Sequence, residues 1–249
     1  MDGQTGLKLD DNWEIICPWA QIMIGTSMPV HITENMIEMT DEILERENKE
    51  DYGKKLAGQI NNEYGIKLEE LEEWGVKKYF QETINKYFAT ILSNHGVLRY
   101  ILDDTSGAWP GSKHTNWSCL LNSMWIVSQY ENEYNPLHNH SNCKLSAVMY
   151  LKIPKYEESR KPYKATDGNI SFVGGGGIDR YFTTLNVAIK PQVGNLFLFP
   201  SSLNHQVYPF RGNGERRSVS FNVDVFSEQQ MEKMRSVDNI QLEQDNRED

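Results

Sequence analysis

The feature that most constrains the fold is a series of short strand-like segments in the second half of the chain. They are rich in β-branched and aromatic residues and span 125–130, 144–153, 169–173, 183–189, 195–199 and 218–226. Turn signals separate several of them: Asp167-Gly168, the run Gly174–Gly177 and Pro191-Gln-Val-Gly194. Many short strands joined by turns predict a β-sandwich or a small barrel.

The run Gly174–Gly177 could also cradle a phosphate. No helix is expected after it, however, and no Lys-Ser or Lys-Thr pair completes a phosphate-binding loop. A hairpin loop is the better interpretation.

The first hundred residues have a mostly helical pattern. Thr33 is a plausible N-cap for a helix whose rough apolar stripe comprises Met36, Ile37, Ile43 and Leu44. A longer helix is expected from Leu68 to Ser93, before Gly96. Its apolar residues recur near the 3.6-residue period: Leu71, Trp74, Phe80, Ile84, Phe88 and Ile91. Core packing explains this stripe better than a cofactor site does.

These patterns predict one domain over residues 1–249, mainly β with helices. Residues 1–119 would be an N-terminal helical region that packs on the core, and residues 120–226 the β core. Residues 227–249, which are polar and charged, would form a short C-terminal helix and tail.

The overall charge bears on possible partners. The formal net charge is −10, which makes a nucleic-acid partner unlikely because phosphate neutralisation needs clustered Lys and Arg. The oligomeric state cannot be read from the sequence.

The three cysteines, Cys17, Cys119 and Cys143, lack C-x-x-C spacing and fit reduced intracellular thiols. Cys143 lies close to His140 and could be a soft metal ligand, but a buried thiol is the simpler interpretation. The N-terminus lacks a secretory pattern and no apolar run is long enough to span a bilayer. We therefore expect a cytoplasmic protein without membrane contact.

Half of the six histidines lie in two short segments. His138 and His140 are two residues apart, so in an extended segment they point the same way. His205 follows another strand-like segment. Imidazole is a common metal ligand, and a nitrogen and oxygen site with open positions suits Fe(II). The pattern predicts that His138, His140 and His205 bind one metal ion.

The last strand-like segment carries two arginines on opposite faces. Alternation along a strand places Arg216, Ser218, Ser220 and Asn222 on one face and Arg217, Val219, Phe221 and Val223 on the other. The first face is polar throughout and suits a pocket. A guanidinium can bind a carboxylate through two parallel hydrogen bonds, so Arg216 is the candidate anion-binding residue, although a surface ion pair is an alternative.

Five segments, in this order and spacing, resemble a known family: 134–140, 145–151, 194–201, 205–209 and 216–222. Over residues 120–226 the chain resembles the double-stranded β-helix (jelly-roll) core of the 2-oxoglutarate/Fe(II)-dependent dioxygenases. It most resembles their uncharacterised bacterial and phage branch. The N-terminal hundred residues contribute nothing to the resemblance.

The resemblance implies roles for individual residues. His138 and His205 match the two histidine ligands of the iron, and Arg216 with Ser218 matches the grip on the far carboxylate of 2-oxoglutarate. Tyr150, and more weakly Tyr134, could also bind this co-substrate.

His140 stands where the family usually has a carboxylate. A third neutral ligand would leave the iron more positive and could change the reaction type. Alternatively, His140 only supports the site, and a water, Asn142 or a carboxylate from elsewhere completes it.

The implied activity is that of an Fe(II)- and 2-oxoglutarate-dependent oxygenase. It would most simply be a hydroxylase that acts on a small molecule or a protein side chain, with no separate catalytic side chain assigned. Two alternatives remain at this stage. One is a cupin-like three-histidine metal-binding protein without 2-oxoglutarate-dependent activity, and the other is a jelly roll that has lost oxygenase activity.

Overall fold

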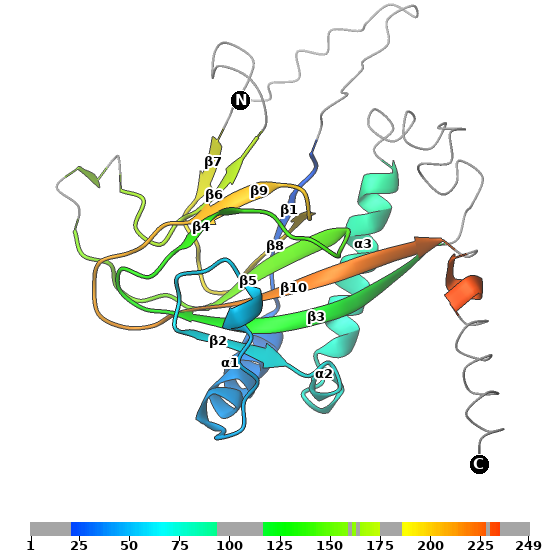
Figure 1. Ribbon diagram of the computed structural model, residues 1–249, viewed down its shortest axis with the longest axis horizontal. Coiled ribbons are helices and arrows are strands. Elements are labelled where there is room, and N and C mark those ends of the chain that lie inside the picture. The colour runs from blue at the N-terminus through cyan, green and yellow to red at the C-terminus, as the bar shows by residue number, and fades with distance from the viewer. Residues whose placement is uncertain are drawn as a thin grey trace, which may run out of the picture.

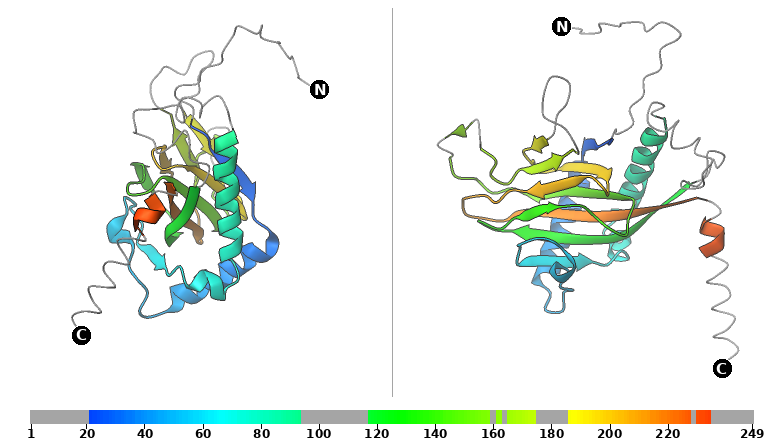
Figure 2. Two further views of the ribbon diagram at one scale, coloured as in Figure 1. Left: turned by 90° about the vertical axis from the view of Figure 1, so that its right-hand side faces the viewer. Right: turned by 45° about the horizontal axis from the view of Figure 1, so that its top comes forward.

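The computed structural model describes residues 21–93, 117–158, 161–162, 165–174, 186–227 and 230–234. In this part of the chain two antiparallel sheets form the centre of the molecule (Figure 1). The larger sheet has the strand order β1-β8-β5-β10-β3-β2, and the smaller has the order β4-β9-β6-β7. Helices α1 and α3 lie on the side of the larger sheet that faces away from the smaller one (Figure 2).

The bounds of the elements follow the chain order. The helices are α1 (Val30–Glu45), the 3-10 turn η1 (Gly53–Lys55), α2 (Glu70–Glu73) and α3 (Lys77–Ser93). The strands are β1 (Ile24–Ser27), β2 (Asn62–Ile66), β3 (Trp117–Gln129), β4 (Asn135–His138), β5 (Leu145–Lys152), β6 (Ile170–Val173), β7 (Asn186–Ile189), β8 (Asn195–Pro200), β9 (Asn204–Val207) and β10 (Arg216–Ser227). This arrangement is a jelly roll, as the sequence predicts.

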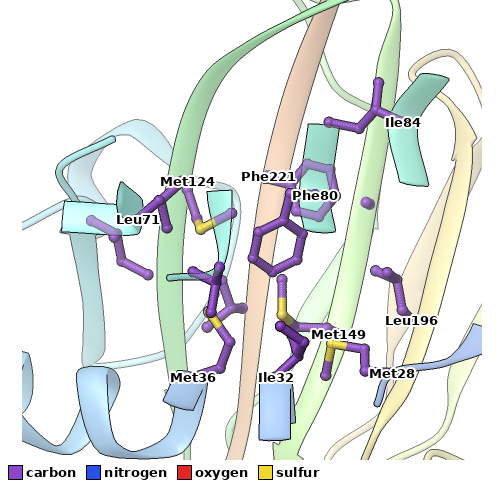
Figure 3. Packing of buried hydrophobic residues seen from close by; sticks show 14 of the residues in the cluster. Met28, Ile32, Met36, Leu71, Phe80, Ile84, Met124, Met149, Leu196 and Phe221 are labelled. Carbon is purple, nitrogen blue, oxygen red and sulfur yellow. The ribbon is translucent and has the colours of Figure 1, made fainter. Parts of the chain in front are cut away.

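Strand β10 lies in the middle of the larger sheet, hydrogen-bonded to β3 on one side and β5 on the other. Its apolar residues Val219, Phe221 and Val223 are fully buried in the core cluster beneath the helices. The ring of Phe221 meets Phe80 of α3 edge-on, with centroids 5.6 Å apart. Figure 3 shows this contact beside Met36 of α1. The helices therefore cover the apolar face of β10 and leave its polar face to the space between the sheets.

A second, smaller cluster of buried apolar residues fills part of that space. The rings of Phe172 on β6 and Phe199 on β8 lie 5.1 Å apart and join the two sheets. This packing fixes the distance between the strands of the smaller sheet and the polar face of β10.

The sequence pattern predicts a helical N-terminal region, but the structure shows that this region also contributes two strands. β1 pairs with β8 and β2 pairs with β3, so both edges of the larger sheet come from residues before position 119. The proposed boundary at residue 120 also falls inside β3. β2 escaped prediction because its sequence, Asn-Glu-Tyr-Gly-Ile, has neither an apolar alternation nor many β-branched residues.

Two helix predictions need correction. α1 begins at Val30 after Pro29, and Thr33 lies inside the helix with its hydroxyl bonded to the Pro29 carbonyl. The helix expected over Leu68–Ser93 is broken at Gly75, whose φ of +66° ends α2 before α3 begins. A glycine adopts this left-handed conformation without strain, so the break is stable.

All six predicted strands are present, with ends that differ by a few residues; β3 is the main exception, since it begins at Trp117. Residues 175–177 of the glycine run, 183–185 of one predicted strand and 235–249 of the predicted tail lie outside the described residues. Within the described ranges, no helix has the length and apolar character needed to cross a membrane.

Arg217 ties α1 to the larger sheet. Its side chain is buried and donates to Asp41 (2.7 Å) and Thr40 (3.0 Å) of α1. It also donates to both carboxylate oxygens of Glu215, at 2.6 and 2.7 Å. The expectation that Arg217 lies on the opposite face from Arg216 is confirmed, and the residue serves the fold.

We predict that Arg217→Ala lowers the free energy of unfolding by about 3 kcal/mol, because it removes a buried guanidinium that joins the buried Thr40 hydroxyl to the partly exposed carboxylates of Asp41 and Glu215. Urea denaturation measures this loss. Lys78→Ala is the control, since Lys78 is exposed and its contact with Glu82 spans 3.7 Å; it should change stability by less than about 0.5 kcal/mol. Equal effects of the two changes would contradict the structural role of Arg217.

Candidate metal and anion site

Strands β4 and β9 bring two histidines face to face. His138 ends β4 and pairs directly with His205 of β9. His140 follows two residues later and is held by a backbone hydrogen bond to the Ser201 carbonyl (2.9 Å). Asn142, with a positive φ of 58°, then turns the chain towards β5.

The three imidazoles converge on one point. The ligand-type nitrogens of His138, His140 and His205 all lie within 4.8 Å of one another. The Nε2 atoms of His140 and His205 are 3.3 Å apart, and their rings are nearly parallel. Among the described residues no Asp, Glu or Cys belongs to this group.

Hydrogen bonds to neighbouring groups orient each imidazole ring. Nδ1 of His138 donates to the Pro136 carbonyl (2.7 Å), and Nδ1 of His205 donates to the Leu203 carbonyl (2.9 Å). Because a carbonyl can only accept, Nε2 of both rings keeps its lone pair. His140 is hydrogen-bonded by the side chain of Asn222. Such outer contacts fix tautomer and orientation in metal-binding histidines.

Burial also keeps the rings neutral. It lowers the pKa of His138, lowers that of His140 to about 4 and lowers that of His205 to about 3. Repulsion from neighbouring imidazoles adds to the lowering of the pKa at His140 and His205. Neutral imidazole is the form that binds a metal. The Nε2 lone pairs of His138 and His205 are therefore available to a cation at neutral pH.

The histidines open into a cavity of about 630 Å³ between the two sheets. The polar stripe of β10 forms part of its wall, as alternation along the strand predicts: Arg216, Ser218, Ser220 and Asn222. The volume is in the range of small-molecule sites.

Arg216 is fully buried against this cavity. Its Nε donates to the Gly168 carbonyl (3.1 Å) and its Nη1 to Oε1 of Gln129 (3.0 Å). Its Nη2 is buried and has no hydrogen-bond partner among the described residues. A buried guanidinium with a free donor is suited to an anion.

Two tyrosine hydroxyls share this environment. Tyr150 and Tyr156 have buried hydroxyls without a hydrogen bond of ordinary geometry among the described residues. The guanidinium carbon of Arg216 lies 5.0 Å from the ring centre of Tyr150. Burial raises the pKa of Tyr150 to about 12 and also raises that of Tyr156, while Arg216 opposes both shifts. Both hydroxyls therefore stay protonated and can donate.

The structure does not bring every predicted residue to the site. Tyr134 is 41% exposed and is not part of the cavity wall. Tyr150 is not among the lining residues either, but it packs against Arg216, which is. Sequence reasoning missed Tyr156, which lies in an irregular segment. Its hydroxyl occupies the place of a side chain at Gly168, where a Cβ would lie only 2.2 Å from it. It also missed Asn222 as the partner of His140 and Glu63 as part of the cavity wall.

Comparison with known proteins gives one family match. Residues 123–222 match the family described as "Putative 2OG-Fe(II) oxygenase". No curated protein sequence matches the chain.

Solved structures that match the chain at low identity include two prolyl hydroxylases and HygX. A prolyl-4-hydroxylase of Pseudomonas putida is 14% identical over 82% of this chain and 93% of its own, with a TM-score of 0.45. A prolyl hydroxylase of Trichoplax adhaerens, in complex with a hypoxia inducible factor peptide fragment, is 11% identical over 85% and 86%, with a TM-score of 0.48. HygX from Streptomyces hygroscopicus, with nickel and 2-oxoglutarate bound, is 12% identical over 81% and 82%, with a TM-score of 0.43.

The family match spans all three histidines and Arg216. Between residues 123 and 222 the chain is therefore similar to the 2OG-Fe(II) oxygenases, in agreement with the resemblance seen in its sequence.

Proposed function

We propose that this protein is a hydroxylase in which His138, His140 and His205 hold Fe(II) and Arg216 holds the far carboxylate of 2-oxoglutarate. The family match over residues 123–222 supports the use of iron and 2-oxoglutarate. The residue roles and the type of oxidation are our assignment.

The donor set fits Fe(II). Three neutral imidazoles leave open positions on a six-coordinate ion, which a redox-active iron centre needs for its co-substrates. With no carboxylate among the described group, the bound ion keeps its full positive charge. An anionic co-substrate is then favoured as the next ligand.

The observation that supports 2-oxoglutarate most strongly is the unsatisfied donor set around Arg216. Nη2 of Arg216 and the hydroxyls of Tyr150 and Tyr156 are buried and lack acceptors among the described residues. Leaving such groups unsatisfied costs about 1–3 kcal/mol each. A carboxylate would satisfy them together. Ser218, which is buried on the same face of β10, is placed to add a hydroxyl.

Fe(II) and 2-oxoglutarate, when bound, would supply the oxidising chemistry: with O2, one oxygen atom would enter succinate as CO2 leaves, and the other would enter a C–H bond of the substrate. The chain's own residues would orient and protect this reaction. Arg216 would hold one end of the co-substrate, and the Nδ1 contacts of His138 and His205 leave their Nε2 atoms free to hold the metal. Phe199 and Phe172 help exclude water from this side of the cavity.

The three-histidine set favours one second candidate, a cupin-like metal-binding protein that does not use 2-oxoglutarate. The absence of a carboxylate from the described group supports it. A metal-binding protein of that kind has no need of the buried guanidinium of Arg216, and we therefore prefer the oxygenase. The substrate itself we expect to be a small molecule or a protein side chain.

The metal assignment predicts one Mn(II) bound per chain, with Mn(II) as a redox-silent probe for Fe(II). His138→Ala, His140→Ala and His205→Ala should each weaken binding at least about 100-fold, because losing a direct ligand exceeds the 10–100-fold effect of losing an outer contact. Electron paramagnetic resonance titration of free Mn(II) measures this.

His31→Ala is the matched control, since His31 is exposed on α1, and it should bind Mn(II) like the unmodified protein. Retained affinity in His140→Ala alone would assign His140 a supporting role. Retained affinity in the His138 or His205 variant would refute the site.

The co-substrate assignment predicts that Arg216→Ala still binds Mn(II). Its binding of 2-oxoglutarate should weaken by about 3–5 kcal/mol, the usual effect of removing one partner of a buried charge pair. Calorimetric titration of 2-oxoglutarate into the anaerobic Mn(II) form measures the loss. Arg217→Lys is the control, because it keeps a cation beside Asp41 and Glu215 outside the cavity. Equal losses in both variants, or no 2-oxoglutarate binding by the unmodified protein, would favour the metal-binding candidate.

A further inference from the structure

One wall of the cavity includes Glu63, which lies outside the residues that the family match covers. It lies on β2, paired with Val127 of β3, which in turn pairs with Ser218 of β10. The three side chains line the same cavity. With strands spaced about 4.8 Å apart, Glu63 lies about 10 Å across the sheet from Ser218. Strand β3 separates it from β10, so it belongs to another part of the wall than Arg216.

The Glu63 side chain is buried, and one of its two carboxyl oxygens has no hydrogen-bond partner among the described residues. The residue is only 2% exposed, and the oxygen without a partner is Oε2. It lies close against the Gly58 backbone, where a Cβ would be 3.0 Å from its Oε1. A buried carboxyl without donors is unfavourable for folding, so its place in a cavity wall points to a ligand.

The charges around Glu63 favour a positively charged ligand over a negatively charged one. Burial, with repulsion from Glu133 and Asp51, raises the pKa of Glu63 to about 7. Lys55 also lines the cavity, but its ammonium group is engaged with Glu50 at 2.8 Å and lies 4.4 Å from the centre of the Tyr52 ring. A cationic group would relieve the repulsion, whereas an anion would add to it.

Aromatic rings connect Glu63's part of the wall with the histidines. Tyr52 and Trp125 line the cavity and stack with centroids 5.3 Å apart. The Trp125 ring lies 5.9 Å from that of His140. Aromatic faces next to a carboxyl suit an alkyl chain that ends in a cationic nitrogen.

We propose that Glu63 binds a protonated amine or guanidinium at the end of an aliphatic chain of the substrate. The aliphatic chain then lies along Tyr52 and Trp125 towards the metal site. This inference rests on the proposed function for the position of the reacting centre. The cationic group can belong to a free alkylamine or to a lysine or arginine side chain.

The test compares two cationic probes with neutral isosteres on the Mn(II) form, with and without 2-oxoglutarate. Cadaverine and 1,5-pentanediol represent free small molecules; N-acetyl-lysine methylamide and N-acetyl-norleucine methylamide represent a protein side chain. Ligand-observed NMR titration measures each affinity. We expect at least one cationic probe to bind about tenfold more tightly than its isostere, and the pair that does so identifies the source.

Glu63→Gln should remove this preference while 2-oxoglutarate and Mn(II) bind as before. Its melting temperature should equal or exceed that of the unmodified protein, since the change removes a buried unpaired acid. Glu72→Gln, on exposed α2, removes the same charge and should keep the preference.

The inference is overturned if neither cationic probe binds more tightly than its isostere, including the case in which none binds, or if Glu63→Gln keeps the preference. Failure of 2-oxoglutarate to bind the unmodified protein would instead refute the proposed function. The comparison of cationic and neutral probes without 2-oxoglutarate would still decide the role of Glu63.

Discussion

The alternation of side chains along β10 is the constraint on which the rest of the structure depends. One face of the strand buries Val219, Phe221 and Val223 under the helices, so its register between β3 and β5 cannot slip without exposing them. The same register places Arg216 and Ser218 in the cavity. The apolar core therefore fixes the position of the two residues proposed to bind the anion. Arg217 strengthens this arrangement through its hydrogen bond to Asp41 of α1.

Burial produces the chemical character of the two ends of the site. At the metal end it keeps the imidazoles neutral, so their lone pairs remain available to a cation. At the other end it leaves the permanent charge of Arg216 with an unused donor. A dianionic co-substrate that spans the two ends would stabilise both. Such a preorganised site costs folding stability, as is common where function requires groups that the fold alone does not satisfy.

The sequence was a good guide where side-chain pattern alone determines structure. Strand alternation separated Arg216 from Arg217, and the spacing of His138, His140 and His205 placed them in one group. Prediction from the sequence failed where contacts between distant segments determine the structure. β2 forms because β3 offers an edge, Gly75 interrupts a helix whose apolar period continues across it, and Tyr156 reaches Arg216 from an irregular segment. Glu63 could not be found because its importance arises only from burial.

The most direct test of the account is a crystal structure of the protein with Mn(II) and 2-oxoglutarate bound. The account predicts the metal at about 2.0–2.2 Å from the Nε2 atoms of the three histidines, by analogy with other metal–imidazole bonds. The far carboxylate of 2-oxoglutarate should accept from Nη2 of Arg216 and from at least one of the Tyr150 and Tyr156 hydroxyls. A metal bound elsewhere, or a co-substrate whose far carboxylate lies away from Arg216, would contradict it.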